Sequence, residues 1–305
     1  MTRVMLDYRA EVFIHVAQCL NITQAARDLY ISQPAVTAAI QKLEEYYNVK
    51  LFLRKSWGLE LTPAGVLLYR HLKELKKAST NLENEMMKLR GTLHGKLSIG
   101  AAPTFGNYIL PHLLGHFSKS HPEISFSLYI GNNAQVYTYL KEGKIELAFL
   151  VGILPGKGLA ARKITKDELI LIVSPHHPWS AREAINGHEL LSQPLILREK
   201  GSSSRKDMEE AFAEIGLSSE ELMVIADFNS FEAIKQAVQA NLGVALISQW
   251  AVKSELEQGR LHCVRIEGAN LTRDIYAATL PKARLTEAAS RLLQLVNKNL
   301  ASFRP

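Results

Sequence analysis

Three groups of small and polar residues could bind a ligand, each placed where an apolar run ends and a helical pattern begins. They are Ala102, Pro103 and Thr104 in GAAPTF, Gly201, Ser202, Ser203 and Ser204 in REKGSSSR, and Asn229 and Ser230 in DFNSFE. Hydroxyl groups and the free N–H groups of helix N-termini favour anions. Arg198, Lys200 and Arg205 beside the serines favour the same ligand. Any one of these Ser, Thr or Asn residues could be a plain N-cap, but their joint placement predicts a site for a small oxyanion or carboxylate.

These residues form no recognisable catalytic or cofactor motif. GILPGKG lacks the spacing and the Ser or Thr that a phosphate loop needs, and GxGxxG, HExxH and GxSxG do not occur. His112 and His116 are four residues apart, but no carboxylate or thiolate partner accompanies them as metal binding would require. We therefore expect no enzyme, no cofactor and no metal site. Other classes of protein that could carry these residues are a metabolite-binding α/β protein or an enzyme with a helical interaction module, and a stand-alone solute-binding protein.

A second group of polar residues lies in ITQAARDLYISQPAVTAAIQKLE, residues 22–44, which predicts two short helices. We expect Thr23 and Ser32 to be their N-caps. The spacing of Val36, Ile40 and Leu43 predicts a buried stripe on the second helix. The outward side then carries Gln33, Pro34, Thr37, Ala38, Gln41 and Lys42.

Gln and Thr at the start of an exposed helix can hydrogen-bond to base edges, and Ser32 and Lys42 can contact phosphates. The segment KLFLRKSWGLELT predicts a β-hairpin whose Arg54 and Lys55 supply a basic wing beside this helix. The simpler alternative is a helical hairpin that only packs. The combination of hairpin, wing and charge favours DNA binding, with Thr23 also on the DNA side.

The bulk composition agrees with a DNA-binding head on a larger globular body. The chain has 305 residues, of which 47% are hydrophobic and 22% charged, and its net charge is +6. Residues 1–94 hold 13 Lys and Arg against 9 Asp and Glu, so 13 − 9 = +4 of that charge lies in under a third of the chain. No apolar run is long enough for a membrane span or a signal peptide. Cys19 and Cys263 lie far apart in sequence. We expect a cytoplasmic protein with reduced thiols and no membrane partner.

The segment after the hairpin predicts a long helix that begins with Thr62 as N-cap and Pro63 at the first position. The helix is expected to run to about Arg90 and to stop at Gly91. Residues spaced alternately by four and three form a heptad seam along it, interrupted only by Ser79. The seam consists of Leu68, Leu72, Leu75, Leu82, Met86 and Leu89. We interpret it as an intermolecular coiled coil, and the alternative is packing on the helix's own domain.

From residue 92 onward, short apolar runs alternate with helical patterns, which predicts mostly parallel sheets covered on both faces. Residues 107–120, for example, are expected to form one helix after the strand KLSIGAA. Two such α/β units and a returning segment predict two lobes joined by crossover strands, with a cleft between them. The expected boundaries are 1–61 for the DNA-binding domain, 62–91 for the linker helix and 92–305 for the effector domain. Lobe 1 would hold about 92–164 and 268–305, and lobe 2 about 165–267.

The N-terminal motifs resemble those of the LysR-type transcriptional regulators. AARDLYISQPAV, IQKLE, VKLF and LTPAG occur in the order and spacing of that family, and LSIGA and YILPHLLGHFSKSHPEI extend the resemblance into the second half. It implies a winged helix-turn-helix, a coiled-coil linker and a two-lobed effector domain like the periplasmic binding proteins. The implied partners are double-stranded promoter DNA, a small-molecule effector and a second copy in a homodimer or homotetramer, with RNA polymerase a further candidate.

The resemblance also bears on single residues. It implies that Thr104, Ser202 and Ser203 line the effector pocket. LREKGSSSR further resembles regulators linked to sulfur or selenium metabolism, which implies sulfite, sulfate or a related anion. The chain departs from the family at Ala38, and less sharply at Ala39, where relatives carry longer polar or basic side chains. Base reading would then fall mainly to Gln33, Thr37 and Gln41.

Overall fold

A computed structural model of the chain describes residues 7–55, 58–88, 94–156 and 158–300. It forms two compact units, Met1–Thr92 and Leu93–Pro305, which we describe separately. Within the described ranges, no helix combines the length and the apolar character that a bilayer crossing needs.

The first unit packs three short helices, a two-stranded hairpin and the start of a long helix around one apolar core. Its elements are α1 (Tyr8–Cys19), α2 (Ile22–Asp28), α3 (Gln33–Tyr47), β1 (Phe52–Lys55), β2 (Gly58–Leu61) and α4 (Pro63–Lys88). Val36, Ile40 and Leu43 are buried, as their spacing predicts. Ala39 is buried with them, so it lies in the core and not on the surface that could contact DNA.

The two predicted helix caps of the hairpin had different outcomes. Ser32 is the N-cap of α3, where its hydroxyl accepts a hydrogen bond from the Ala35 backbone N–H. The prediction for Thr23 was wrong. Asn21 caps α2 by accepting from the Gln24 N–H, and Thr23 lies inside the first turn. Asn is at least as good an N-cap as Thr, and placing it there starts the helix at Ile22.

Helix α4 begins as predicted, since the Thr62 hydroxyl accepts from the Gly65 N–H at 2.9 Å. Its apolar seam is divided. Leu72 is buried in the core of its own unit and Leu68 packs against that core, so these two positions contribute to packing within the unit, as the alternative interpretation of the seam expected. The reason is that the first turns of α4 also complete the core beneath α1. Leu75, Leu82 and Met86 are exposed, and Leu89 lies outside the described residues.

The second unit has two lobes, each with a sheet covered by helices. In chain order the first lobe holds β3 (Gly95–Ala101), α5 (Pro103–Tyr108), α6 (Leu110–Ser120), β4 (Ile124–Ile130), α7 (Asn133–Lys141) and β5 (Leu147–Val151). The second holds β7 (Ala184–Asn186), β8 (Leu195–Arg198), α8 (Ser203–Glu214), β9 (Val224–Phe228), α9 (Phe231–Gln239), β10 (Val244–Ser248), α10 (Gln249–Glu257) and β11 (His262–Glu267). Short 3-10 helices at Pro178–Ala181 and Gly187–Ser192 flank β7, and α11 (Glu287–Asn299) packs back against α6 in the first lobe.

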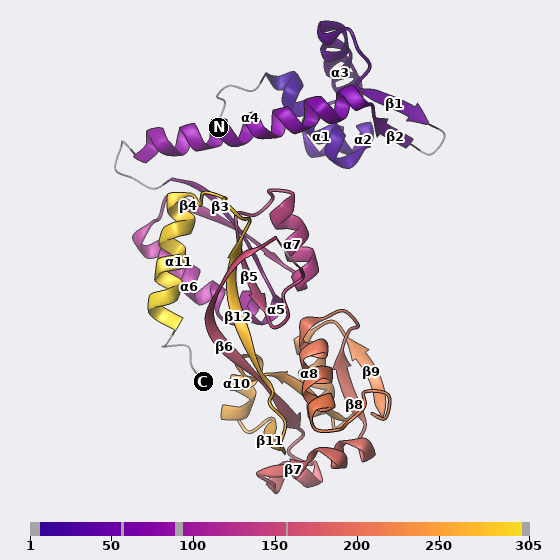
Figure 1. The fold of residues 1–305 in the computed structure, drawn as a ribbon, viewed down its shortest axis with the longest axis vertical. Coiled ribbons are helices and arrows are strands. Elements are labelled where there is room, and N and C mark those ends of the chain that lie inside the picture. The colour runs from indigo at the N-terminus through magenta and orange to yellow at the C-terminus, as the bar shows by residue number, and fades with distance from the viewer. Residues whose placement is uncertain (1–6, 56–57, 89–93, 157, 301–305) are drawn as a thin grey trace. The chain divides into compact units, whose positions relative to one another are not determined.

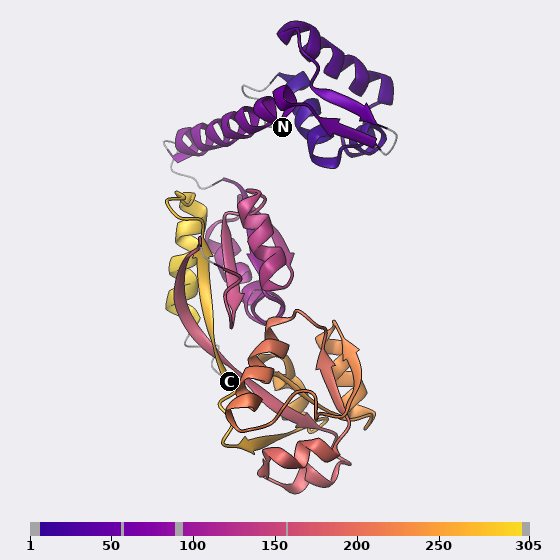
Figure 2. The same cartoon turned by 45° about the vertical axis from the view of Figure 1, so that its right-hand side comes forward.

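Two long antiparallel strands, β6 (Ala160–Val173) and β12 (Thr272–Thr279), join the lobes. Figures 1 and 2 show them side by side, running from one lobe into the other. The continuous strand order is β4-β3-β5-β12-β6-β10-β8-β9, with β11 on the far part of β6. Strand β6 pairs with β12 up to Glu168 and with β10 and β11 from Leu169 onward. The crossover strands that the sequence predicts are therefore present.

One predicted helix is divided in two. The segment expected as a single helix from 107 to 120 belongs to α5, which starts earlier at Pro103, and to α6, which starts at Leu110. Pro111 explains the break, because a proline lacks the N–H that would continue the α5 hydrogen bonds. As a result α5 is a separate short helix that carries Thr104 at the end of β3.

Candidate functional site

The predicted DNA-contacting residues lie on the surface of the first unit. Gln33, Pro34, Gln41 and Lys42 are exposed on α3, Thr37 is half-buried, and Arg54 and Lys55 are exposed on the wing strand β1. Thr23 is exposed on α2, and its hydroxyl accepts a hydrogen bond from the Gln33 side-chain amide. The start of α3 and the first turn of α2 therefore form one polar surface.

Two details refine this surface. Lys55 forms an ion pair with Glu60 across the hairpin, so Arg54 is the stronger candidate for a phosphate contact. Arg27 and Tyr30 border a groove together with Thr23, Ser32 and Gln33, and neither was predicted from sequence. The Tyr30 side chain is 96% exposed. A tyrosine in the expected bend between the two helices is the only sequence signal that could have drawn attention to it.

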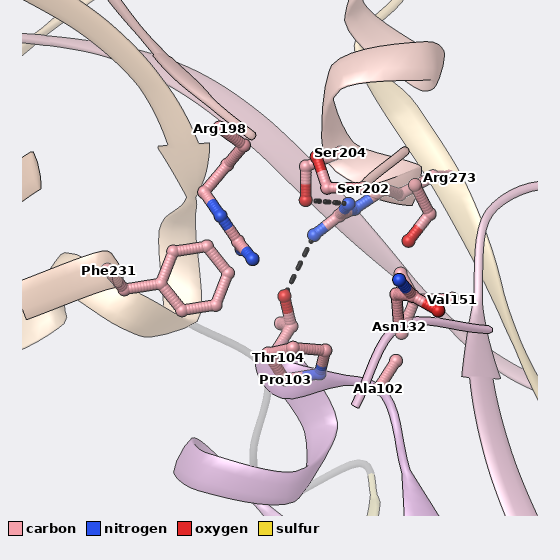
Figure 3. Close-up of a pocket in the computed structure, with 11 residues that line it drawn as sticks. Ala102, Pro103, Thr104, Asn132, Val151, Arg198, Ser202, Ser204, Phe231 and Arg273 are labelled. Atoms are coloured by element: carbon pink, nitrogen blue, oxygen red, sulfur yellow. Dashed lines mark hydrogen bonds between the residues drawn. The ribbon is translucent and has the colours of Figure 1, made fainter. Parts of the chain in front are cut away.

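The second candidate site is a cavity between the two lobes of the second unit. It brings together most of the predicted effector residues from both lobes, with partners that the sequence did not identify. Its lining consists of Ala102, Pro103, Thr104, Asn132, Val151, Arg198, Ser202, Ser203, Ser204, Phe231 and Arg273 (Figure 3). The cavity volume is about 10 Å³, close to the smallest that holds one ordered water. A larger ligand can enter only if side chains or lobes move.

Several predicted residues lie elsewhere. Gly201, Asn229 and Ser230 do not line this cavity. Gly201 is exposed in a left-handed turn, and the hydroxyl of Ser230 caps α9. Arg205 is held by Glu209 and Asp227, and Lys200 is exposed. Of the three flanking basic residues only Arg198 reaches the cavity.

Arg273 is the central polar residue of the cavity and connects the lobes. It lies on β12 directly opposite Asp167 of β6 in the strand register. Its Nε and Nη2 donate to Asp167 Oδ2 at 2.9 and 2.7 Å. Nη2 also donates to the Thr104 hydroxyl in the first lobe at 2.9 Å, and Nη1 donates to the Ser204 hydroxyl in the second at 2.8 Å. One guanidinium thus fixes the positions of two predicted effector residues.

Arg198 approaches the same cavity from β8. Its guanidinium lies 4.4 Å from the centre of the Phe231 ring and is bonded to Glu199 through Nε and Nη2. These contacts leave Nη1 without an acceptor among the described residues. Figure 3 shows the guanidinium end directed into the cavity between Phe231 and Thr104. A buried guanidinium with open donors is suited to an anion.

Asp207 of α8 adds a third contact across the lobes. It accepts from Arg273 Nη1 at 3.4 Å and from the Ile153 N–H beyond β5. Burial raises the pKa of Asp207 despite the neighbouring Arg273 charge. Its carboxylate also fills the space where a Cβ on Gly152 would lie, at a backbone φ of +70°. The Gly152 position therefore needs glycine for both its conformation and this close approach.

The sequence analysis did not predict a role for Asn132, Asp167 or Arg273. It named Arg198 only as a basic residue beside the serines and not as part of the cavity lining. Asp167 and Arg273 are separated by the whole second lobe in the chain and meet only through the β6–β12 register. The alternation of Arg273 with Ile275 and Ala277 on the buried face of β12 is the signal that could have identified it. Among the described residues, no three His, Cys, Asp or Glu side chains gather to hold a metal ion.

Both units of the chain match known protein families. The family described as "Bacterial regulatory helix-turn-helix protein, lysR family" matches residues 9–66, and "LysR substrate binding domain" matches residues 90–301. A probable RuBisCO transcriptional regulator of Trichormus variabilis is 30% identical over 285 residues, covering 92% of this chain and 85% of that protein. Its counterpart in Guillardia theta is 34% identical over 272 residues, with 88% of each chain covered.

Solved structures show the same fold. Full-length CbnR in complex with its target DNA superposes with a TM-score of 0.67 at 22% identity, covering 96% of this chain and 99% of that one. The regulatory domain of Synechocystis CcmR in complex with 2-PG has a TM-score of 0.62 at 26% identity and covers 67% of this chain and 97% of that one.

Proposed function

The chain belongs to the LysR family of bacterial transcriptional regulators, and from that premise we propose that it controls a promoter in response to a small oxyanion or carboxylate bound in the cavity between its lobes. The family consists of DNA-binding regulators with a small-molecule effector, so the enzyme and solute-binding alternatives are set aside. DNA binding is assigned to the exposed face of α3 and to the wing. Because its partner is DNA, we also place the protein in the cytoplasm, with RNA polymerase a further proposed partner.

The observation that supports the anion is the set of hydrogen-bond donors around the cavity. The hydroxyls of Thr104, Ser202 and Ser204 and the Arg198 guanidinium all border it. The first two N–H groups of α8 have no acceptor within the helix and carry the positive end of its dipole. The described residues that line the cavity include no carboxylate. Such a site stabilises negative charge and offers no carboxylate partner to an ammonium group.

The size of the cavity supports a change of conformation on binding. A sulfate or a small carboxylate is larger than the single water that fits, so Thr104 and Ser204 must separate slightly to admit it. These residues belong to different lobes, and Arg273 bonds both. An effector can shift a conformational equilibrium only through its different affinity for the two states. We propose that occupancy changes the angle between the lobes and thereby the pairing of effector domains in a homodimer or homotetramer.

A thermal-shift screen of the full chain tests the ligand class. Sulfite, sulfate, small carboxylates and 2-PG form the anionic set, with 2-PG included because the CcmR domain was solved with it. Matched amines and neutral alcohols form the control set. Binding to the native state raises the melting temperature, and the stabilisation grows with the logarithm of the ratio of free ligand to Kd. A shift with an anion that disappears in the Thr104→Val variant supports the proposal, and a shift only with amines or neutral compounds contradicts it.

A further inference from the structure

Tyr30 occupies a backbone position that usually belongs to glycine. Helix α2 ends in a Schellman motif, in which the Tyr30 N–H donates to the Arg27 carbonyl and the Ile31 N–H donates to the Ala26 carbonyl. This motif places Tyr30 in the left-handed region, at a φ of 55°. A residue with a Cβ costs free energy there, which is why glycine is the common choice. The first unit is therefore less stable with tyrosine at this position than it would be with glycine.

The described residues offer nothing that compensates for this cost. The Tyr30 side chain is 96% exposed. Its ring has no aromatic or cationic partner and its hydroxyl has no hydrogen-bond partner within the described part of the chain. The bend itself is held by backbone hydrogen bonds, which do not depend on the phenol. A strained residue whose side chain contacts only solvent is a candidate for contact with a partner molecule.

The groove beside Tyr30 contains a second group without a partner, the Arg27 guanidinium. Arg27 follows Thr23 by four residues on α2, so the two side chains share one helix face. Both line the groove together with Ser32 and Gln33, and Arg27 is the only charged residue among the described residues that do so. Arg27 is exposed and forms no ion pair with any described carboxylate. Its charge is therefore available to a ligand.

Other basic residues of the first unit are already paired. Lys50 and Lys55 form ion pairs with Glu44 and Glu60, which reduce the charge that they present to a polyanion. The start of α3, in contrast, adds the positive end of a helix dipole to the groove that Arg27 lines. An open guanidinium, a phenol and a helix N-terminus with no carboxylate beside them are suited to a phosphate group.

We propose that Arg27 and Tyr30 contact the phosphate backbone of DNA at the helix-turn-helix bend, beside the bases that Gln33 contacts. The inference rests on the proposed assignment of DNA binding to the exposed face of α3. A phosphate contact carries no sequence information, but it fixes the register in which Gln33 meets base edges. The left-handed turn directs the phenol outward before DNA binds, so less conformational freedom is lost on binding.

Fluorescence anisotropy of the full chain with its operator and with a duplex of unrelated sequence, over a range of salt concentrations, tests the proposal. Arg27→Gln should weaken binding to both duplexes by the same factor. The slope of the logarithm of the binding constant against that of salt concentration should become shallower by about 0.9 for each copy bound. Arg70→Gln is the matched control, because Arg70 is exposed on α4 outside the groove. It should leave the slope unchanged.

Two variants of Tyr30 separate DNA contact from folding. Tyr30→Phe keeps the ring and the turn but lacks the hydroxyl, and it should weaken binding to both duplexes at least about threefold for each copy bound. Tyr30→Gly should raise the melting temperature of the first unit, because it removes the Cβ from the left-handed position. Its DNA binding should nevertheless fall at least as far as that of Tyr30→Phe. A purely structural role for Tyr30 would not produce changes of opposite sign.

Wild-type affinity and salt slope in either Arg27→Gln or Tyr30→Phe would overturn the inference. A loss confined to the operator would also overturn it, because a phosphate contact acts on both duplexes. Gln33→Ala distinguishes this failure from failure of the proposed function. If Gln33→Ala loses operator discrimination, α3 still contacts the bases and only the phosphate contact is wrong. If Gln33→Ala also binds like the wild type, the assignment of DNA binding to α3 fails as well.

Discussion

At the scale of single residues, DNA reading depends on a few side chains of moderate length. Ala38 is exposed on α3 but offers only a methyl group, and Ala39 is buried in the core. The polar groups left on the exposed face near the helix start are Gln33, Thr37 and Gln41. Among them Gln33 is already positioned by its bond to Thr23, which lowers the entropy lost when it contacts a base.

Replacing Gln33 with Ala should therefore weaken operator binding by about 1–3 kcal/mol, the usual contribution of a specific side-chain contact to a base. Binding to unrelated DNA should change much less, because phosphate contacts are kept. Gln18→Ala on α1, also exposed, is the control and should leave affinity unchanged. Fluorescence anisotropy with cognate and mutated operators measures both, and unchanged discrimination between them would refute the role of Gln33.

Asp207 is a single residue that should make the stability of the folded chain depend on pH. Because burial raises its pKa above the ordinary 3.8, the folded state holds a proton more tightly than the unfolded state. The contribution of Asp207 to the free energy of unfolding is fully present below pH 3.8. It is lost as the pH rises through the pKa that this group has in the folded state. Asp207→Asn should remove that loss. Its melting temperature relative to wild type should rise as pH increases above 3.8, and a constant difference at all pH values would contradict this.

At the scale of elements, the β6–β12 ribbon carries the buried ion pair on which the cavity is built. Arg273 and Asp167 are 5% and 1% exposed, and Asp167 also accepts from the Ser248 hydroxyl at 2.8 Å. Such a pair has a large desolvation cost, and its main effect on stability appears when one partner is removed and the other charge stays buried. The ribbon therefore positions Arg273 rigidly between the lobes.

Arg273→Met should destabilise the chain by about 3–5 kcal/mol, since it leaves Asp167 charged and buried. The double variant Arg273→Met with Asp167→Asn should recover part of that loss because the uncompensated charge is gone. Arg291→Met removes an exposed pair with Glu287 on α11 and should cost at most about 1 kcal/mol. Urea unfolding compares the three. A cost for Arg273→Met as small as that for Arg291→Met would contradict the assignment.

Helix α4 is the second element with a predicted role. Because Leu68 and Leu72 pack within their own unit, the exposed leucines and methionine left for the predicted self-association seam are Leu75, Leu82 and Met86. Leu82→Asp places a charge in that seam and should shift the chain from dimer toward monomer in light scattering. Leu67→Asp is the control, since Leu67 is 51% exposed on the same helix but off the heptad positions. Equal masses for wild type and Leu82→Asp would reject the coiled coil.

At the scale of the whole molecule, the two compact units divide the work between DNA contact and effector binding. Each has its own apolar core, so each can keep its internal structure while their arrangement changes. Coupling then requires that the effector favour one arrangement of the assembly over another. The cavity is suited to this, because its hydroxyls belong to separate lobes joined by two strands.

Footprinting of the promoter with and without the identified anion tests the coupling. The protected region or the pattern of hypersensitive sites, which reports DNA bending, should change on anion addition. In Thr104→Val the same anion should have no effect, while the footprint without anion should match wild type. An identical footprint and bend in the presence of saturating anion would show that occupancy is not transmitted to the DNA.

The sequence by itself determined the class of the protein and most of its local structure. Helical spacing identified the Val36, Ile40 and Leu43 stripe, and the cap residues Ser32 and Thr62 marked two helix starts, because these signals depend only on neighbours within a few residues. The hydroxyls at Thr104 and at Ser202 to Ser204 were found for the same reason, since they begin helices after strands.

Only the tertiary structure decided what these hydroxyls do. Arg273 and Asp167 become neighbours through the register of two strands separated by a complete lobe, and no local pattern encodes such a pairing. Likewise, the division of the α4 seam depends on which leucines meet the core of their own unit. The hydrogen bonds that Arg273 donates to Thr104 and Ser204 depend on such long-range contacts, so the sequence could propose an anion but not the bonds that hold these hydroxyls in place.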